Sequence, residues 1–159
     1  MSESPASVLT LNMAVDIAAP PADVWRALTA DINRWWPQSF FTGGEESSRQ
    51  LVFEATPGGR MYEQWDADSG LLWAQVVAVQ PTRLLQVLGH SFPSWGGPST
   101  WYGTWEFSGD ERGTKLSFSE SVVGHVPDGY VDDKTKGWNF LWDCLRAHLE
   151  GSEPPVWAD

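Results

Sequence analysis

The stretch that decides the fold lies near the end of the chain and reads GWNFLWDCLRAHLEG, residues 137–151. Large apolar side chains recur in it every three or four residues, which is the spacing of one face of an α-helix. That face comprises Trp138, Leu141, Trp142, Leu145 and Leu149, with Val131 two turns earlier, and the opposite face comprises Asn139, Asp143, Arg146 and Glu150. Gly151 stands where a C-cap belongs, and Pro154-Pro155 prevents continuation. The spacing predicts a long amphipathic helix near 131–150.

Outward from this helix, the rest of the chain reads mainly as strands. Residues 8–17 alternate apolar and polar side chains, as in a strand with one buried face. Pro20-Pro21 ends that strand and starts a short helix, and Asp31 is placed to cap a second short helix through Trp35. Turn residues then separate six strand-like segments, at roughly 51–56, 60–66, 71–79, 82–89, 100–108 and 114–122. Strands in runs predict an α+β fold with an antiparallel sheet and helices on one side.

Several short motifs occur in the order and spacing of a known family. They are PGGRMYE at 57–63, LWAQV at 72–76, QPTRL at 80–84, GTKL at 113–116 and the helical stretch itself. Together they resemble the START-like (SRPBCC) superfamily, in a branch similar to the activator of heat-shock-90 ATPase homologues. The resemblance implies a helix-grip fold, in which a curved sheet of six to seven strands wraps the C-terminal helix around a cavity. We expect one START-like domain over 8–151, with terminal tails at 1–7 and 152–159.

The composition stands out in tryptophan, which accounts for 11 of the 159 residues. Tryptophan combines a large apolar surface with one N–H donor, so it suits cavity walls as well as cores. The formal net charge of −11 argues against nucleic acid and anionic membranes, because both are bound through clustered Lys and Arg. No apolar run approaches the ~18 residues of a membrane span, and the acidic N-terminus lacks the basic region of a signal peptide. We therefore expect a cytoplasmic protein.

The groups most often used in catalysis and metal binding are scarce. Cys144 is the only cysteine, so it makes no internal disulfide, and we interpret it as a small buried thiol. The three histidines, His90, His125 and His148, have no metal-ligand spacing, so we predict neither a metal nor a cofactor. His90-Ser91 imitates a nucleophile elbow, but Pro93 occupies the place of the second glycine.

The hairpin around 109–113 predicts which side chains share a sheet face. Pairing Phe107 with Thr114 places apolar residues beside apolar residues, whereas a slip by one residue mixes them with Lys115. The resulting apolar face opposes the helix and carries Trp101, Gly103, Trp105, Phe118 and Glu120, facing Trp138 and Trp142. We predict these seven residues as the ligand-binding set. Gly103 leaves a gap between two indoles, although a glycine can equally mark a bulge.

Glu120 is the one carboxylate on this apolar face. It is either a polar anchor or general acid in a cavity, or a strand-end residue that reaches solvent or pairs with an arginine. Trp35-Trp36 presents a similar choice between the rim of a cavity and the packing of a short helix.

Three functions follow, in order. The first is binding of a small apolar or aromatic ligand in an aromatic-lined cavity, as the resemblance to a superfamily that binds lipids, hormones and polyketides implies. The second is a cyclase- or hydrolase-like enzyme that uses Glu120 or a histidine as acid or base. The third is a co-chaperone-like interaction module. A chaperone partner ranks last because the eukaryotic activators carry an additional N-terminal domain that this sequence does not include.

Overall fold

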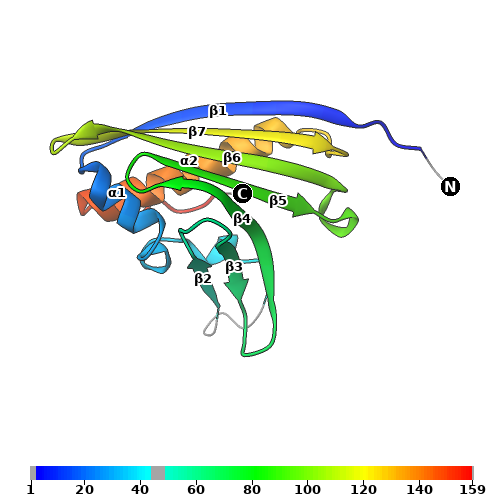
Figure 1. The fold of residues 1–159 in the computed structure, drawn as a ribbon, viewed down its shortest axis with the longest axis horizontal. Coiled ribbons are helices and arrows are strands. Elements are labelled where there is room, and N and C mark those ends of the chain that lie inside the picture. The colour runs from blue at the N-terminus through cyan, green and yellow to red at the C-terminus, as the bar shows by residue number, and fades with distance from the viewer. Residues whose placement is uncertain (1–2, 44–48, 159) are drawn as a thin grey trace.

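A seven-stranded antiparallel sheet and one long helix make up most of the molecule (Figure 1). The computed structural model describes residues 3–43 and 49–158. The elements in chain order are β1 (Ser7–Ile17), α1 (Pro21–Leu28), η1 (Ile32–Arg34), η2 (Gln38–Phe40), β2 (Gln50–Phe53), β3 (Arg60–Gln64), β4 (Gly70–Gln80), β5 (Leu84–Ser91), η3 (Pro93–Trp95), β6 (Ser99–Asp110), β7 (Gly113–Gly124) and α2 (Tyr130–Glu150), where η marks a 3₁₀ turn. The predicted α+β helix-grip fold is confirmed.

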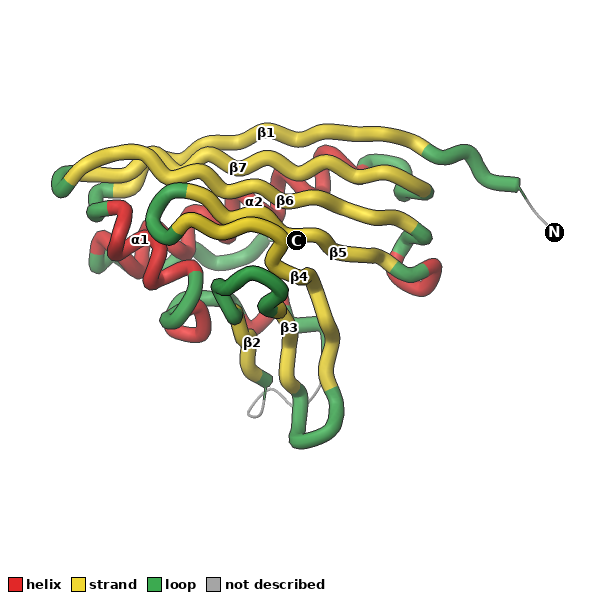
Figure 2. Tube along the Cα trace, viewed as in Figure 1, coloured by secondary structure: helices red, strands yellow, loops and turns green. Residues whose placement is uncertain are grey.

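The sheet is curved rather than flat. Its strand order is β1-β7-β6-β5-β4-β3-β2, so the first strand pairs with the last. The register shifts between Met61 and Tyr62 on β3, and again between Val76 and Ala78 on β4. Such irregularities bend a strand and increase its twist, and Figure 2 shows β4 turning sharply where β2 and β3 join the sheet. The two halves of the sheet therefore enclose space instead of forming one plane.

Helix α2 covers the concave side, packing against β1 and α1. Its predicted stripe is buried at Leu141, Trp142 and Leu145, with Leu145 fully inaccessible, and half-buried at Trp138 and Leu149. Val131 is an exception: it is 37% exposed and does not belong to the stripe, because it lies in the first turn, beyond the sheet contact. The helix ends as expected at Gly151, which has the left-handed φ of +70°.

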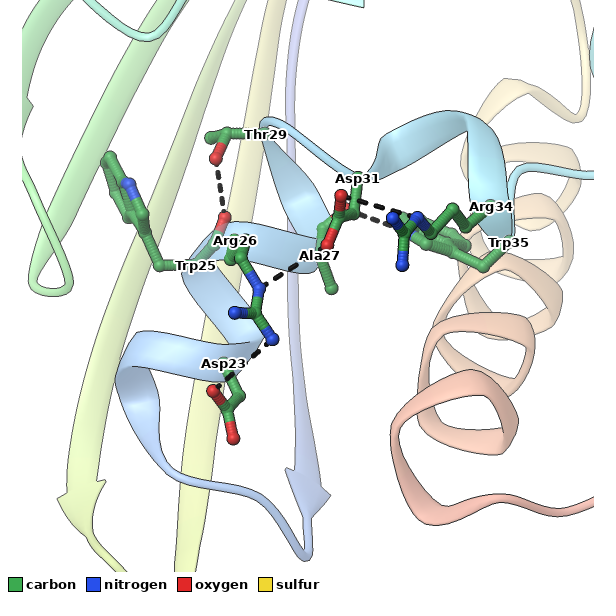
Figure 3. Close-up of polar contacts among 8 residues, drawn as sticks. All are labelled: Asp23, Trp25, Arg26, Ala27, Thr29, Asp31, Arg34 and Trp35. Atoms are coloured by element: carbon green, nitrogen blue, oxygen red, sulfur yellow. Dashed lines mark hydrogen bonds and ion pairs between the residues drawn. The ribbon is translucent and has the colours of Figure 1, made fainter.

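The predicted second short helix forms as a single 3₁₀ turn, and the cap predicted for it is wrong. This turn is η1, and the Asp31 side chain does not cap it. The Asp31 carboxylate instead lies between two arginines, 3.3 Å from Arg26 Nε and 3.4 Å from Arg34 Nε (Figure 3). The same close-up shows Trp35 donating its indole N–H to the carbonyl of Ala27, at 2.7 Å, which ties the turn to α1.

The predicted hairpin register is wrong by two residues, although the predicted faces are right. Phe107 pairs with Leu116 rather than Thr114, and Trp105 pairs with Phe118. The reason is a tighter turn: Glu111 and Arg112 alone connect the strands, and the Asp110 carboxylate accepts the Arg112 amide at 2.8 Å. Because side chains alternate with a period of two, a shift of two changes the partners and preserves the face.

Candidate functional site

A cavity of about 460 Å³ lies between the concave face of the sheet, α2 and the two turns after α1. Seven of the eleven tryptophans line it, which accounts for much of the excess seen in the composition: Trp36, Trp73, Trp95, Trp101, Trp105, Trp138 and Trp157. Phe40, Met61 and Leu141 add further apolar surface. The wall is thus mainly flat and aromatic, with a small polar sector.

Glu120 occupies that polar sector. It projects from β7, is 3% exposed and lines the cavity. Its Oε1 accepts the Tyr130 hydroxyl at 2.7 Å and its Oε2 accepts the Trp138 indole N–H at 3.1 Å. Lys134 Nζ lies 3.8 Å from Oε1. The structure places the Glu120 carboxylate in the cavity wall rather than in solvent, and its cationic neighbour is a lysine rather than an arginine.

The three partners of Glu120 come from one face of α2. Tyr130, Lys134 and Trp138 follow one another at intervals of four residues, so they stack along the helix. Sequence reasoning missed Tyr130 and Lys134, although this spacing, extended toward the start of the helix from Trp138, could have found them. Burial, and then the Glu120 charge, raises the pKa of the Tyr130 phenol well above its usual range. Tyr130 therefore stays a hydrogen-bond donor.

Four of the seven predicted site residues line the cavity and three lie behind its wall. Trp101, Trp105, Glu120 and Trp138 are in the wall. Phe118 and Trp142 are buried one layer deeper, where Phe118 contacts the rings of Trp105, Trp138 and Trp142 with centroids 4.4–5.6 Å apart. These two residues support the wall and do not face the cavity.

Gly103 does not provide the gap predicted for it. A side-chain Cβ at Gly103 would lie 3.1–3.3 Å from the rings of Trp105 and Trp101 and from Val87, so the space is already filled. The indole of Trp101 also lies over Gly89, its direct partner on β5, where a Cβ would come within 2.2 Å of the ring. The two glycines therefore let Trp101 lie flat on the sheet and form part of the wall.

The adjacent tryptophans 35 and 36 divide between the two predicted roles. Trp35 is buried and packs the turn, while Trp36 lines the cavity. The indole nitrogens of Trp36 and Trp105 are both buried and have no hydrogen-bond partner in the described part of the chain. An unpaired buried donor is costly.

A second buried carboxylate, which sequence reasoning missed, lies at the edge of this region. Glu63 on β3 is fully buried and accepts the Thr42 amide and hydroxyl and the indole N–H groups of Trp65 and Trp73. Trp73 lines the cavity, so Glu63 holds part of the wall from behind. Alternation along the strand could have found Glu63, because it places Glu63 on the same face as the apolar Met61.

The loop between β5 and β6 forms the exposed rim. Phe92 and Trp95 are 66% and 53% exposed and contact each other edge to face, with centroids 6.2 Å apart. Gly96 lies against Pro127 of the β7–α2 connection, and both line the cavity. The rim thus joins two loops that precede β6 and α2.

The other reactive groups lie apart from this site. Cys144 is buried, and burial, with a contribution from the charge of Asp143, raises the pKa of its thiol to about 11. The His90 ring is on the solvent side, 3.0 Å from the Thr100 hydroxyl. Within residues 3–43 and 49–158, no three His, Cys, Asp or Glu side chains are grouped as metal ligands. No described helix has the length and apolarity needed to cross a membrane.

Comparison with known proteins agrees with this architecture. The model of the family described as Activator of Hsp90 ATPase homolog 1-like protein matches residues 18–150. No curated protein matches the chain. A crystal structure of a Mesorhizobium loti protein aligns with a TM-score of 0.65 and 23% identity, covering 91% of this chain and 99% of that one.

Two further solved structures align over similar lengths. A protein from Rhizobium leguminosarum gives a TM-score of 0.63 and 24% identity, over 94% of this chain and 100% of that one. The solution structure of the Aha1 dimer from Colwellia psychrerythraea gives a TM-score of 0.59 and 18% identity, over 89% of this chain and 96% of that one. At these identities the structural likenesses establish the fold.

Proposed function

Because this chain belongs to the Activator of Hsp90 ATPase homolog 1-like family, within the START-like superfamily, we propose that it binds one small, largely apolar molecule inside its cavity. The observation that carries the proposal is a cavity of about 460 Å³ with seven tryptophans and one buried carboxylate in its wall. Small-molecule sites typically measure ~300–1,000 Å³ and combine apolar walls with a few polar groups.

The wall also supports a chemical class of ligand. Flat indole faces pack well against fused or aromatic rings. Glu120 offers acceptor oxygens, so it selects a ligand with a hydrogen-bond donor. Lys134 already lies 3.8 Å from this carboxylate and offsets part of its charge. A neutral hydroxyl therefore fits this sector better than a second cation, and we propose a hydroxylated aromatic or alicyclic ligand.

The two other functions rank below binding. An acid–base enzyme would need a second titratable partner for Glu120, but no histidine or cysteine is among the described residues that line the cavity. A chaperone partner rests on the family description, and the exposed apolar pair Phe92 and Trp95 belongs to the rim of the same cavity.

The test starts with native mass spectrometry of freshly purified protein, to detect a co-purified molecule. Isothermal titration calorimetry then compares 2-naphthol with 2-methoxynaphthalene, which has the same rings but no donor. We expect 2-naphthol to bind about tenfold more tightly, the value of one hydrogen bond to a charged acceptor. Absence of both a co-purified molecule and probe binding would overturn the proposal. Equal affinities for the two probes would refute only the anchoring role of Glu120 and would leave the binding proposal standing.

A further inference from the structure

The segment that follows α2 returns to the cavity instead of extending away from the domain. The helix ends at Gly151, and the Ser152 amide donates to the Ala147 carbonyl at 2.9 Å, which reverses the chain direction. In Figure 1 the red end of the chain leaves α2 and comes back to the centre of the molecule, where the C-terminus is marked. Pro154-Pro155 keeps this stretch extended and stiff.

Trp157 is the residue that this segment delivers. Its ring contacts Phe140 of α2 and Phe40 of η2, with centroids 4.9 Å and 5.3 Å apart. The ammonium of Lys136 lies 4.7 Å from the same ring. Trp157 also lines the cavity. One side chain therefore joins the outer side of α2, the turn η2 and the cavity wall.

These contacts lie where η2 meets α2 in the cavity wall, and we call this junction the η2–α2 seam. Phe40 stacks on Phe140 at 5.5 Å, and its ring edge lies 3.8 Å from where a Cβ of Gly137 would be. Phe40 and Gly137 both line the cavity, so η2 and α2 meet in its wall at this place. Trp157 covers the seam, since it contacts both aromatic rings.

We propose, on the basis of the proposed binding function, that residues 152–158 act as a strap that closes the cavity, with Trp157 as a ligand-contacting residue that limits ligand size. Aromatic and cation–π contacts are individually weak, so the strap opens without unfolding of the sheet. Opening widens the cavity along the η2–α2 seam. The strap thus controls both the release of the ligand and the largest ligand that fits.

The first experiment needs no ligand. Acrylamide quenching of tryptophan fluorescence is measured for Trp157→Ala, Trp157→Phe and a chain that stops after Gly151. All three lack the Trp157 indole, and only Trp157→Phe keeps a ring over the seam. We expect about twofold stronger quenching in Trp157→Ala and in the shortened chain than in Trp157→Phe, because the wall indoles become accessible. Equal quenching in the three proteins would overturn the strap.

The second experiment measures size selectivity with 2-naphthol and the larger 1-pyrenol. We expect Trp157→Ala to raise the affinity for 1-pyrenol relative to 2-naphthol by about fivefold and to speed dissociation of 2-naphthol. Val156→Ala is the matched control, because Val156 is 90% exposed and adjacent in sequence. An unchanged ratio in Trp157→Ala would refute the size limit.

The two proposals fail in different ways. If wild type and variants bind neither probe while quenching still separates Trp157→Ala from Trp157→Phe, the strap stands and binding of this ligand class falls. If the probes bind but no variant differs from Val156→Ala, binding stands and the strap falls.

Discussion

Glu63 and Glu120 are the same residue type, both almost inaccessible, both on strands and both holding tryptophan N–H groups. Their surroundings differ. Glu63 accepts hydrogen bonds from Thr42, Trp65 and Trp73, and these uncharged donors lie in the η2–β2 connection, in the β3–β4 connection and on β4. Among the described residues, Glu120 is held from α2 alone, by Tyr130, Trp138 and the nearby Lys134, and it lines the cavity.

The difference favours a structural role for Glu63 and, under the proposed binding function, a ligand-contacting role for Glu120. A buried charge is tolerated where donors satisfy it, and the more donors it organises, the more its loss leaves unsatisfied. Glu63 organises two connections and strand β4, which supports a role in holding the wall. Glu120 has the same burial with partners on one side only, so it retains acceptor capacity for a ligand. Burial alone would not distinguish the two.

The largest expected effect is on stability at Glu63. Glu63→Leu should lower the free energy of unfolding by about 3 kcal/mol or more, because the N–H groups of Thr42, Trp65 and Trp73 lose one shared buried acceptor. Urea denaturation followed by circular dichroism measures it. Glu120→Leu should cost about 1 kcal/mol or less, since Tyr130 and Lys134 can turn toward solvent. Equal losses would break the distinction between the two carboxylates.

For ligand binding we expect the reverse order, with a larger effect at Glu120 than at Glu63. Glu120→Leu should weaken 2-naphthol about tenfold and leave 2-methoxynaphthalene unchanged or tighter, because only the former donates to the carboxylate. Glu120→Gln keeps an acceptor oxygen and should give an intermediate loss. Calorimetric titration of both probes checks this. If both Glu120 variants bind like wild type, Glu120 is structural and the cavity is purely apolar.

A smaller effect on stability is expected from removing one hydroxyl donor from each of the two carboxylates. Thr42→Val removes the 2.9 Å bond to Glu63, and Tyr130→Phe removes the 2.7 Å bond to Glu120. We expect losses of about 1.5 and 0.5 kcal/mol, respectively, because water entering the cavity can replace the Tyr130 hydroxyl. Urea denaturation of the two near-isosteric variants provides the measurement. A larger loss for Tyr130→Phe would show that the Glu120 side is as closed as the Glu63 side.

The sequence predicted the fold better than the site, for physical reasons. Period-two and period-3.6 patterns report which face is buried, so the α2 stripe and the face carrying Trp105 and Glu120 were predictable. The register of β6 on β7 was not, because it depends on whether two or more residues make the turn. The apolar pattern is nearly satisfied by either pairing.

The cavity itself depends on contacts between segments far apart in the chain. Trp36, Trp73 and Trp157 come from a turn, an inner strand and the segment after α2, and no local pattern places them together. Tyr130 and Lys134 differ from these, since helical spacing from Trp138 predicts their common face. The burial of Glu63 could likewise have been predicted from the alternation along β3.

The smallest effect concerns the ionisation of Tyr130, and it tests the electrostatic side of the Glu120 site. Burial first, and the Glu120 charge second, raises the pKa of this phenol above its ordinary value of about 10. In the unfolded chain the phenol ionises in its ordinary range, so above about pH 10 the unfolded state binds fewer protons than the folded state. The stability that Tyr130 contributes is therefore complete below this pH and declines as pH rises.

Two measurements test this decline of stability with rising pH. Between about pH 8 and pH 11, the urea midpoint of wild type should fall more steeply than that of Tyr130→Phe. In the folded protein, Tyr130→Phe should leave the tyrosinate absorbance at 295 nm below about pH 11 unchanged, because Tyr130 contributes none of it. Glu120→Gln should restore part of this ionisation, since it removes the charge but not the burial. A Tyr130 that ionises in wild type as early as in Glu120→Gln would show that the Glu120 carboxylate is screened by solvent. The cavity sector would then be wet, unlike the closed surroundings of Glu63, and a hydroxyl ligand would gain less there than proposed.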